Sequence, residues 1–360
     1  MDAYWDGGPR VSTEFTYRGI ETALLENDHL RVMVLPGKGG DILEFRDKRT
    51  DTDVLWHAQH NWQSPAEGYI PPTGVDSWMA YWPGGWQVNL PIAGWGGTVG
   101  GVDYGTHGES ALIPWDATVT EASDDAVALQ LTTELATYPI AAERTLRLPA
   151  EASRLEISES LTNRGDTPVE YIWQQHIALG RPLIGPAARF DIPAQRGLVD
   201  PTYDTSDTFE HGRLDGGATF DWPHAPAATG GTIDLREFPP PDVKLHDQAY
   251  ALELEAGWYA VSNPAIDLGF GVQFPRDPFE CVWYWQAFGG FEESPFFGRN
   301  YNVGIEPTSA YPAGSIPEAQ RENGTINTLE PGADITAELA ALTFEGRDRV
   351  EHITPDGTVR

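Results

Sequence analysis

The 360-residue chain contains a single cysteine, Cys281, so no intrachain disulfide can form. Cys281 is flanked by apolar residues in the stretch FECVWYW, and we interpret it as a small buried hydrophobic residue rather than a nucleophile. The N-terminus lacks the basic region and apolar run of a secretory signal. No run approaches the roughly 18 apolar residues of a membrane-spanning helix. These absences predict a cytoplasmic protein that does not bind a membrane.

Basic residues, and lysines above all, are also scarce. Lysine and arginine together number 23 against 54 aspartates and glutamates, for a formal net charge of -31, and only Lys38, Lys48 and Lys244 are lysines. Nucleic-acid binding requires a basic face, so this charge argues against a nucleic-acid partner. The acidic residues are scattered rather than blocked, which is typical of a halophilic protein whose self-repulsion is screened by salt.

Long amphipathic helical patterns are absent, and signals for strands are frequent. The 38 glycines, 29 prolines and many aromatic residues indicate short strands joined by turns. Residues 154–162 alternate polar and apolar side chains and are followed by the turn sequence of residues 163–166, which predicts antiparallel pairing. We therefore predict an all-β fold built from antiparallel sheets.

The length would allow two average domains, but all-β folds often run longer as one unit. We predict a single domain over residues 1–360 with a core at about 16–345. Residues 347–360 carry no pattern, and we expect them to fray.

Residues 56–105 are rich in tryptophan, glycine and proline and show little periodicity. We interpret this stretch as long loops over a binding face. His57 and His60 would share one face of a helix and could bind a metal there. No helical context or further ligand accompanies them, so we predict neither a metal nor another cofactor.

Three titratable residues lie at strand ends or tight turns. His107 lies between glycines, His176 lies within an apolar strand, and Glu306 follows Val303-Gly304-Ile305 and precedes Pro307. Because proline cannot donate to a ladder, we expect the strand to end there. Partial desolvation would raise the pKa of Glu306, which suits a general base. Taken singly, a glutamate before such a turn is more often a surface carboxylate, and a histidine within an apolar strand is more often a core residue.

Taken in order, these residues resemble a known pattern. The stretch NDHLRVMVLPGKGGDILEFRDKRTDTDVLW (residues 27–56) is similar to the opening of the galactose mutarotase (aldose 1-epimerase) superfamily. Its closing signature is matched by Glu306-Pro307, Tyr311-Pro312 and the turn of residues 329–332. The resemblance covers about residues 16–345. It implies an antiparallel β-supersandwich with a sugar site in a concave groove and no cofactor.

The resemblance also implies roles for the three residues. His176 would be the general acid toward the pyranose ring oxygen, Glu306 the general base on the anomeric hydroxyl, and His107 a partner that binds and polarises a hydroxyl. The family's hydroxyl-binding aspartate is matched best by Asp247, with Asp242 as the rival.

Other residues complete the expected site. Gln175 beside His176, Trp86, and the pair Trp283 and Trp285 are candidates to line it, although the pair could as well belong to the core. Arg299 is a candidate to bind an anionic substituent, but arginines more often form a structural ion pair. The Arg and Asn of the family's better-known enzymes are replaced by GGWQVNLP at residues 84–91, as in divergent members, which leaves the sugar undetermined.

These patterns predict an isomerase that interconverts the anomers of a small sugar, as a monomer or homodimer. One alternative is a catalytically inactive carbohydrate-binding or regulatory protein on the same fold. Another is an epimerase of a phosphorylated or sulfonated sugar, which would need two or more arginines near Glu306.

Overall fold

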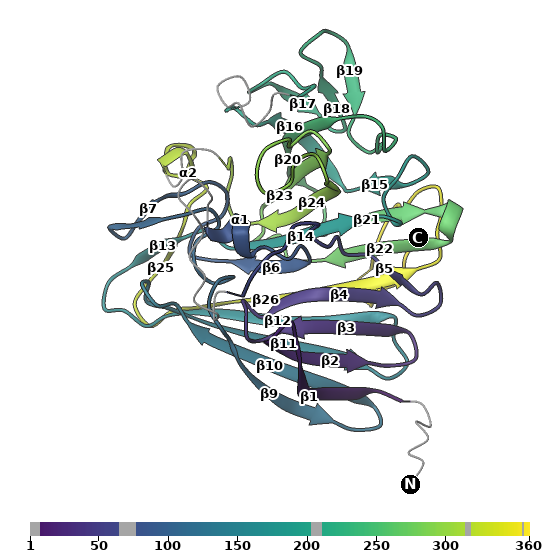
Figure 1. The fold of residues 1–360 in the computed structure, drawn as a ribbon. Helices are drawn as coiled ribbons and strands as arrows, with labels where there is room; N and C mark the ends of the chain where they lie inside the picture. The colour runs from purple at the N-terminus through teal and green to yellow at the C-terminus, as the bar shows by residue number, and fades with distance from the viewer. Residues whose placement is uncertain (1–7, 65–76, 203–210, 314–317, 355) are drawn as a thin grey trace.

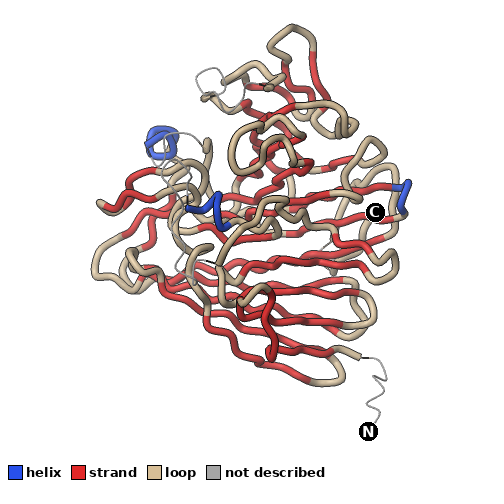
Figure 2. Tube along the Cα trace, in the orientation of Figure 1, coloured by secondary structure: helices blue, strands red, loops and turns tan. Residues whose placement is uncertain are grey.

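The computed structural model describes residues 8–64, 77–202, 211–313, 318–354 and 356–360, and it is nearly all β (Figures 1 and 2). Within these ranges the helices are two short ones, α1 (Ser77–Tyr81) and α2 (Glu318–Asn323), and a 3-10 turn at Pro264–Ile266. The prediction of an all-β, antiparallel fold is confirmed.

Most strands form two sheets whose registered pairs are antiparallel. The 12-stranded sheet has the order β1 (Arg10–Tyr17), β2 (Ile20–Glu26), β3 (Leu30–Leu35), β4 (Asp41–Asp47), β6 (Trp86–Asn89), β14 (Gln174–Gly180), β24 (Tyr301–Thr308), β23 (Cys281–Phe288), β20 (Leu245–Leu254), β16 (Ala194–Val199) and β17 (Thr219–Asp221), and β5 (Thr52–Asp53) pairs with β4. The 8-stranded sheet has the order β15 (Arg189–Asp191), β21 (Trp258–Asn263), β22 (Leu268–Gln273), β26 (Asp334–Phe344), β12 (Arg154–Asn163), β11 (Ile140–Pro149), β10 (Ala126–Glu134) and β9 (Asp116–Ala122).

Three two-stranded sheets complete the described strands. They pair β13 (Val169–Tyr171) with β25 (Asn327–Leu329), β18 (His224–Pro226) with β19 (Thr232–Asp234), and β7 (Gly97–Val99) with β8 (Val102–Tyr104).

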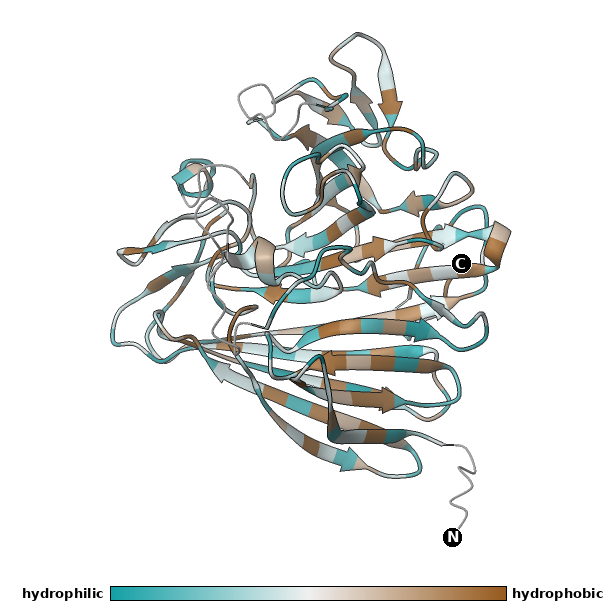
Figure 3. Ribbon diagram, in the orientation of Figure 1, coloured by the Kyte–Doolittle hydropathy of each residue, from teal (hydrophilic) through white to brown (hydrophobic). Residues whose placement is uncertain are grey.

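The two large sheets pack face to face, with β1 and β2 lying over β9 and β10 (Figure 1). Apolar and polar residues alternate along many of the strands (Figure 3). The buried apolar residues of both sheets form the core. Aromatic pairs join the sheets: the rings of Phe45 on β4 and Phe270 on β22 are 5.4 Å apart, and those of Phe190 on β15 and Tyr284 on β23 are 4.8 Å apart.

A buried polar tie also crosses the sandwich. Arg144 on β11 and Glu159 on β12 form an ion pair of 2.8 Å with side chains 1% and 2% exposed. Gln175 on β14 donates to Glu159 over 2.6 Å and accepts from the indole of Trp86 over 2.8 Å. Trp86 and Gln175 therefore face the inside of the sandwich and not a sugar groove. Successive side chains of a strand point to opposite faces, so the neighbours of these two residues face the other side of the sheet.

Other expectations also need correction. The aromatic stretch contains the central strand β6, which its lack of periodicity hid. The strand with Glu306 continues through Pro307 to Thr308. The ladder between β14 and β24 pairs Gln174 with Thr308 and Ala178 with Gly304, and it is interrupted between these two pairs. The interruption accommodates Pro307, which has no N–H to donate.

The C-terminal segment also differs from the expectation of fraying. Val350 and Ile353 are buried in a small cluster with Trp258 on β21 and Leu342 on β26. The amide of Val350 donates to Asp191 over 2.9 Å. Separately, no helix in the described ranges has the length and apolar character needed to cross a membrane.

The buried tie predicts a large cost for removing one of its charges. We expect Glu159→Gln to lower the free energy of unfolding by about 3–5 kcal/mol, because Arg144 keeps its charge away from water without its ion-pair partner. Glu156→Gln is the matched control on the same strand, since its side chain is 34% exposed and its ion pairs are on the surface, and it should cost less than about 1 kcal/mol. Urea denaturation at fixed salt measures both. Equal effects would contradict the proposed role of the tie.

Candidate active site

A cavity of about 60 Å³ lies over the face of the 12-stranded sheet opposite the sandwich interior. The alternation along β14 sends Gln174 and His176 to this face and Gln175 to the other. Glu306 on β24 pairs in register with Trp283 on β23, and Trp283 pairs with Tyr250 on β20. The cavity is lined by Trp78, Met79, Gly94, Trp95, Thr106, His107, His176, His246, Gln248, Trp283, Trp285, Phe291, Phe296, Glu306 and Ala313.

His176 and Glu306 meet in this cavity. Nε2 of His176 is 3.4 Å from Oε1 of Glu306, and both side chains are 3% exposed. The other carboxyl oxygen of Glu306 accepts from the side-chain amide of Gln174 over 2.9 Å. Asn89 on β6 donates to the side-chain oxygen of Gln174 over 2.8 Å. The carboxyl group is thus held in a fixed orientation, with one oxygen toward His176.

Burial sets the proton state of the pair. It raises the pKa of Glu306 well above its ordinary value and lowers the pKa of His176 to about 3. Both shifts favour the uncharged form of the group concerned. A titratable proton on this pair is therefore held by Glu306 in preference to His176.

His107 reaches the same place from a tight turn. Its backbone is left-handed, with φ of 61°, and a side chain at the following Gly108 would clash with the Leu90 carbonyl at 2.3 Å. The amide of Gly94 donates to Nδ1 of His107 over 3.0 Å, so the proton of the neutral ring is on Nε2. Burial, followed by the nearby His176, lowers the pKa of His107. The two imidazole rings are 4.9 Å apart.

Two tryptophans cover the histidines, and our sequence analysis did not identify them. The Trp78 ring on α1 is 4.3 Å from His107 and stacks on Trp82 at 4.8 Å, and Trp82 is 5.3 Å from His176. Their spacing of four residues is the one signal that could have placed them on one helical face.

A chain of buried hydrogen bonds holds Trp78. Its indole donates to Gln87 over 2.9 Å, Gln87 donates to Asp41 over 2.7 Å, and Asp41 pairs with Lys38 over 2.6 Å. Lys38 also donates to the carbonyl of Ala111 over 2.9 Å. Lys38 and Asp41 are fully buried, so this chain anchors the cover of the cavity to β4 and β6.

The opposite wall comes from β20 and β23. Trp283 and Trp285 share one face of β23, and both line the cavity. The indole of Trp285 donates to Nε2 of His246 over 2.6 Å. His246 and Gln248 were missed in the sequence, although they flank Asp247, because the local pattern there is only loosely similar to the family motif.

Asp247 and Arg299 lie outside the cavity. Asp247 points to the opposite face of β20, where it accepts from the amide and side chain of Arg213 over 2.8 and 2.7 Å. Its rival Asp242 is exposed and does not line the cavity. Arg299 lines a separate groove. The alternation of β20 explains the error for Asp247, because its neighbours His246 and Gln248 take the cavity face.

The two other histidines of interest are apart from the cavity. Nε2 of His57 is 2.6 Å from Asp53, and His60 packs against Phe296 with ring centres 5.9 Å apart. Across the residues that the structure describes, no group of three or more His, Cys, Asp or Glu side chains could hold a metal ion.

The antiparallel sandwich defines a class of protein: it has the galactose mutarotase-like fold. A proposed aldose 1-epimerase from Klebsiella pneumoniae superposes with a TM-score of 0.68 at 18% identity, covering 94% of this chain and 83% of that one. A galactose mutarotase-like protein from Clostridium acetobutylicum gives a TM-score of 0.64 at 11% identity, covering 94% and 99%. A galactose mutarotase related enzyme from Lactobacillus acidophilus gives 0.58 at 19% identity, covering 92% and 100%.

At these identities the structures establish the fold alone. The sequence model of a family described as a domain of unknown function, DUF4432, matches residues 17–342, so the chain belongs to that family. No curated protein shows significant sequence similarity to it.

The buried pair predicts a particular dependence of stability on pH. Between the ordinary carboxyl pKa of 4.5 and the raised value in the fold, the native state holds the Glu306 proton and the unfolded state does not. Wild-type stability therefore falls as pH rises through this window. We expect Glu306→Gln to gain stability over the wild type by up to about 1.4 kcal/mol per pH unit in the same window.

Urea denaturation from acid to neutral pH at fixed salt tests this expectation. His176→Asn is a control of opposite sign: the wild-type histidine has a folded pKa of about 3 against the ordinary 6.5, so its contribution to stability rises with pH between these values. Parallel pH curves for the wild type and Glu306→Gln would refute the burial argument.

The hydrogen-bond chain to Trp78 predicts a second effect. Gln87→Leu removes the side-chain acceptor of the Trp78 indole and one of the two donors to Oδ2 of Asp41. We expect it to cost about 1–3 kcal/mol and to reduce the near-ultraviolet circular dichroism of the stacked tryptophans. Gln130→Leu is the control, because Gln130 on β10 donates to Glu143 on β11 at the exposed face of the sheet, so its loss leaves no buried group unpaired. A Gln87 variant with an unchanged spectrum would show that Trp78 is held by packing alone.

Proposed function

We propose that the chain is a mutarotase of the aldose 1-epimerase kind, which interconverts the α and β anomers of an aldose by opening and reclosing its ring. The observation that carries the proposal is the contact between His176 Nε2 and Glu306 Oε1, 3.4 Å apart in a buried cavity walled by aromatic rings. The galactose mutarotase-like fold and the neighbours named as aldose epimerases or mutarotases support it.

Ring opening moves two protons, one from the anomeric hydroxyl and one to the ring oxygen. We assign Glu306 as the base at the hydroxyl and His176 as the acid at the ring oxygen, with His107 donating from Nε2 to a neighbouring hydroxyl. The closed sugar is then accompanied by a carboxylate and an imidazolium. The open-chain sugar is accompanied by a carboxylic acid and a neutral imidazole. Rotation about the C1–C2 bond and reclosure reverse both transfers and give the other anomer.

The electrostatics of the cavity favour the open-chain arrangement. Burial raises the pKa of Glu306 and lowers the pKa of His176 to about 3, so the proton rests on the carboxyl group. This is the proton distribution that accompanies the high-energy intermediate. A site that favours it lowers the cost of ring opening.

The lining of the cavity bears on the substrate. Its aromatic faces and few polar groups suit one face of a pyranose. Among the described residues that line it, none is Arg or Lys, which favours a neutral aldose over a phosphorylated or sulfonated one. Its volume of about 60 Å³ is below the range of ligand pockets, so the proposal requires Phe296, which lies outside the hydrogen-bond chain to Trp78, to move when sugar enters.

Anomer exchange measured by saturation-transfer NMR on a panel of neutral aldoses at molar salt tests the function. We expect the wild type to accelerate exchange of at least one sugar, and Glu306→Gln and His176→Asn each to lose about 10²–10⁴-fold of that acceleration. Glu170→Gln, on the surface in a pair with Arg321, should keep full activity.

Two results would contradict the proposal. Binding of a sugar without accelerated exchange would indicate a carbohydrate-binding or regulatory protein on the same fold. Full activity in Glu306→Gln would remove the assigned base.

A further inference from the structure

A groove of about 780 Å³ lies on the same sheet as the cavity but shares none of its lining residues. It runs over β3, β4 and β5 and is bordered by residues 55–59, by Arg181 and Pro182 after β14, and by Arg299 and Tyr301 at the start of β24. We call it the arginine groove. Its volume is within the usual range of small-molecule sites.

The charge of the arginine groove is opposite to that of the whole protein. Four arginines line it (Arg31, Arg46, Arg181 and Arg299), of 20 in the chain, against three acidic residues of 54. A protein with a net charge of -31 therefore gathers a fifth of its arginines around one groove. Such a local excess attracts anions.

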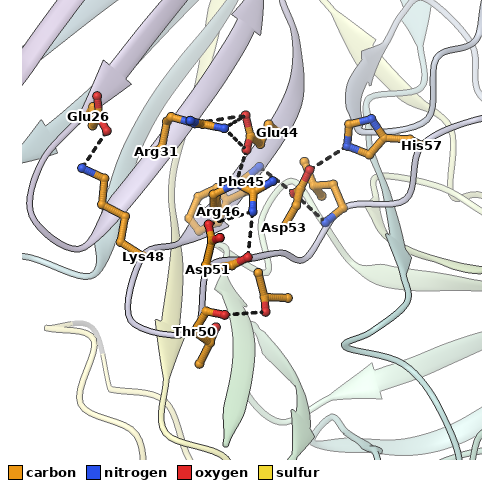
Figure 4. A network of polar contacts seen from close by, with 12 residues as sticks. Glu26, Arg31, Glu44, Phe45, Arg46, Lys48, Thr50, Asp51, Asp53 and His57 are labelled. Atoms are coloured by element: carbon orange, nitrogen blue, oxygen red, sulfur yellow. Dashed lines mark hydrogen bonds and ion pairs between the residues drawn. The ribbon is translucent and has the colours of Figure 1, made fainter. Parts of the chain in front are cut away.

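Two of these arginines are already neutralised (Figure 4). Arg31 binds both oxygens of Glu44, over 2.7 and 3.0 Å, and Arg46 bridges Glu44 and Asp51. This network fixes the floor of the groove, and it pairs two of the three acidic residues, Glu44 and Asp51, with arginines.

The third acidic residue, Asp53, pairs with His57 and favours the protonated form of its imidazole. It accepts from the amides of Phe45 and Leu55, both over 3.1 Å, and its other oxygen is 2.6 Å from Nε2 of His57 (Figure 4). Burial lowers the pKa of His57, but the hydrogen bond to Asp53 and the negative charges of Asp53 and Glu44 together outweigh burial and raise it. The imidazole is 44% exposed and lines the groove.

Arg181 and Arg299 have no carboxylate partner in the part of the chain that the structure describes. The Arg181 guanidinium lies over the ring of Tyr301 at 5.6 Å, and Nε of Arg299 donates to the carbonyl of Phe296 over 3.4 Å. The register that pairs Gly180 with Asn302 puts Arg181 opposite Tyr301, two residues from Arg299. Arg181 and Arg299 thus come from neighbouring strand ends that border the same groove.

We propose that the arginine groove binds a hydroxylated organic anion, a sugar acid or a sugar phosphate, at a site separate from the cavity. Arg181 and Arg299 bind the carboxylate or phosphate group, because guanidinium groups match the geometry of both. Gln59 is exposed, lines the groove and can bind hydroxyls. The rings of Tyr17, Trp56 and Tyr301 supply the apolar surface.

The test measures binding by isothermal titration calorimetry in the Glu306→Gln protein, so that the result does not depend on the proposed mutarotase activity. The probes are gluconate, glucose 6-phosphate, inorganic phosphate and the neutral polyol glucitol. Titrations use the lowest salt at which the circular dichroism spectrum is unchanged. We expect both sugar anions to bind more tightly than glucitol and phosphate, and their affinity to fall as salt is raised.

The variant combines Arg181→Gln with Arg299→Gln, and we expect it to weaken binding of gluconate and glucose 6-phosphate at least tenfold. Arg196→Gln is the matched control, because Arg196 is exposed on β16 and pairs with Asp221 outside the groove. The two single variants, expected to lose binding in part, replace the double variant if it does not fold.

The relative affinities of the two sugar anions identify the source of the charge, carboxylate or phosphate. Unchanged affinity in the variants, or gluconate binding no tighter than glucitol, would overturn the anion site. Inorganic phosphate binding as tightly as glucose 6-phosphate would overturn the assignment of a hydroxylated ligand.

Discussion

The alternation of side chains along β14 is the constraint on which the rest of the structure depends. His176 points to the cavity, and Gln175, the residue before it, points into the sandwich and binds Glu159. One strand therefore carries half of the proposed acid–base pair on one face and a tie between the sheets on the other. A shift of register by one residue would exchange the two faces and destroy both. The bond from Gln175 to Glu159 of the buried Arg144–Glu159 pair would be lost in such a shift, so the pair opposes it.

The same two-residue period explains what could be predicted from the sequence and what could not. The order of His107, His176 and Glu306 along the chain was enough to predict that they share one site, because the resemblance supplied a motif for each. Asp247, Gln175 and Trp86 were also chosen from motifs, but a motif does not state which face of a strand its members take. The register of β20 and β6, which sequence alone does not fix, decided these three cases.

The cover of the site was beyond prediction for a different reason. Trp78 and Trp82 lie in a stretch without periodicity, and their position depends on the bond from Trp78 to Gln87 and on the buried pair of Asp41 with Lys38. A fully buried lysine is rare unless it is paired. Lys38 is one of only three lysines in the chain, and its burial has a structural use: it anchors the one helix that packs over the histidines.

The distribution of charge follows two different rules in this molecule. Over the whole surface, acidic residues outnumber basic ones, and salt screens their repulsion. In the cavity, burial disfavours the charged forms of both Glu306 and His176. The charges that the proposed mechanism places on this pair lie next to each other and away from water, so distant charges, which salt would screen, contribute little to them. The proposed chemistry is therefore protected from high salt by the same desolvation that makes it possible, whereas an anion held by exposed arginines is not. The two sites should accordingly differ in their response to salt, with exchange of aldose anomers insensitive to it and anion binding sensitive.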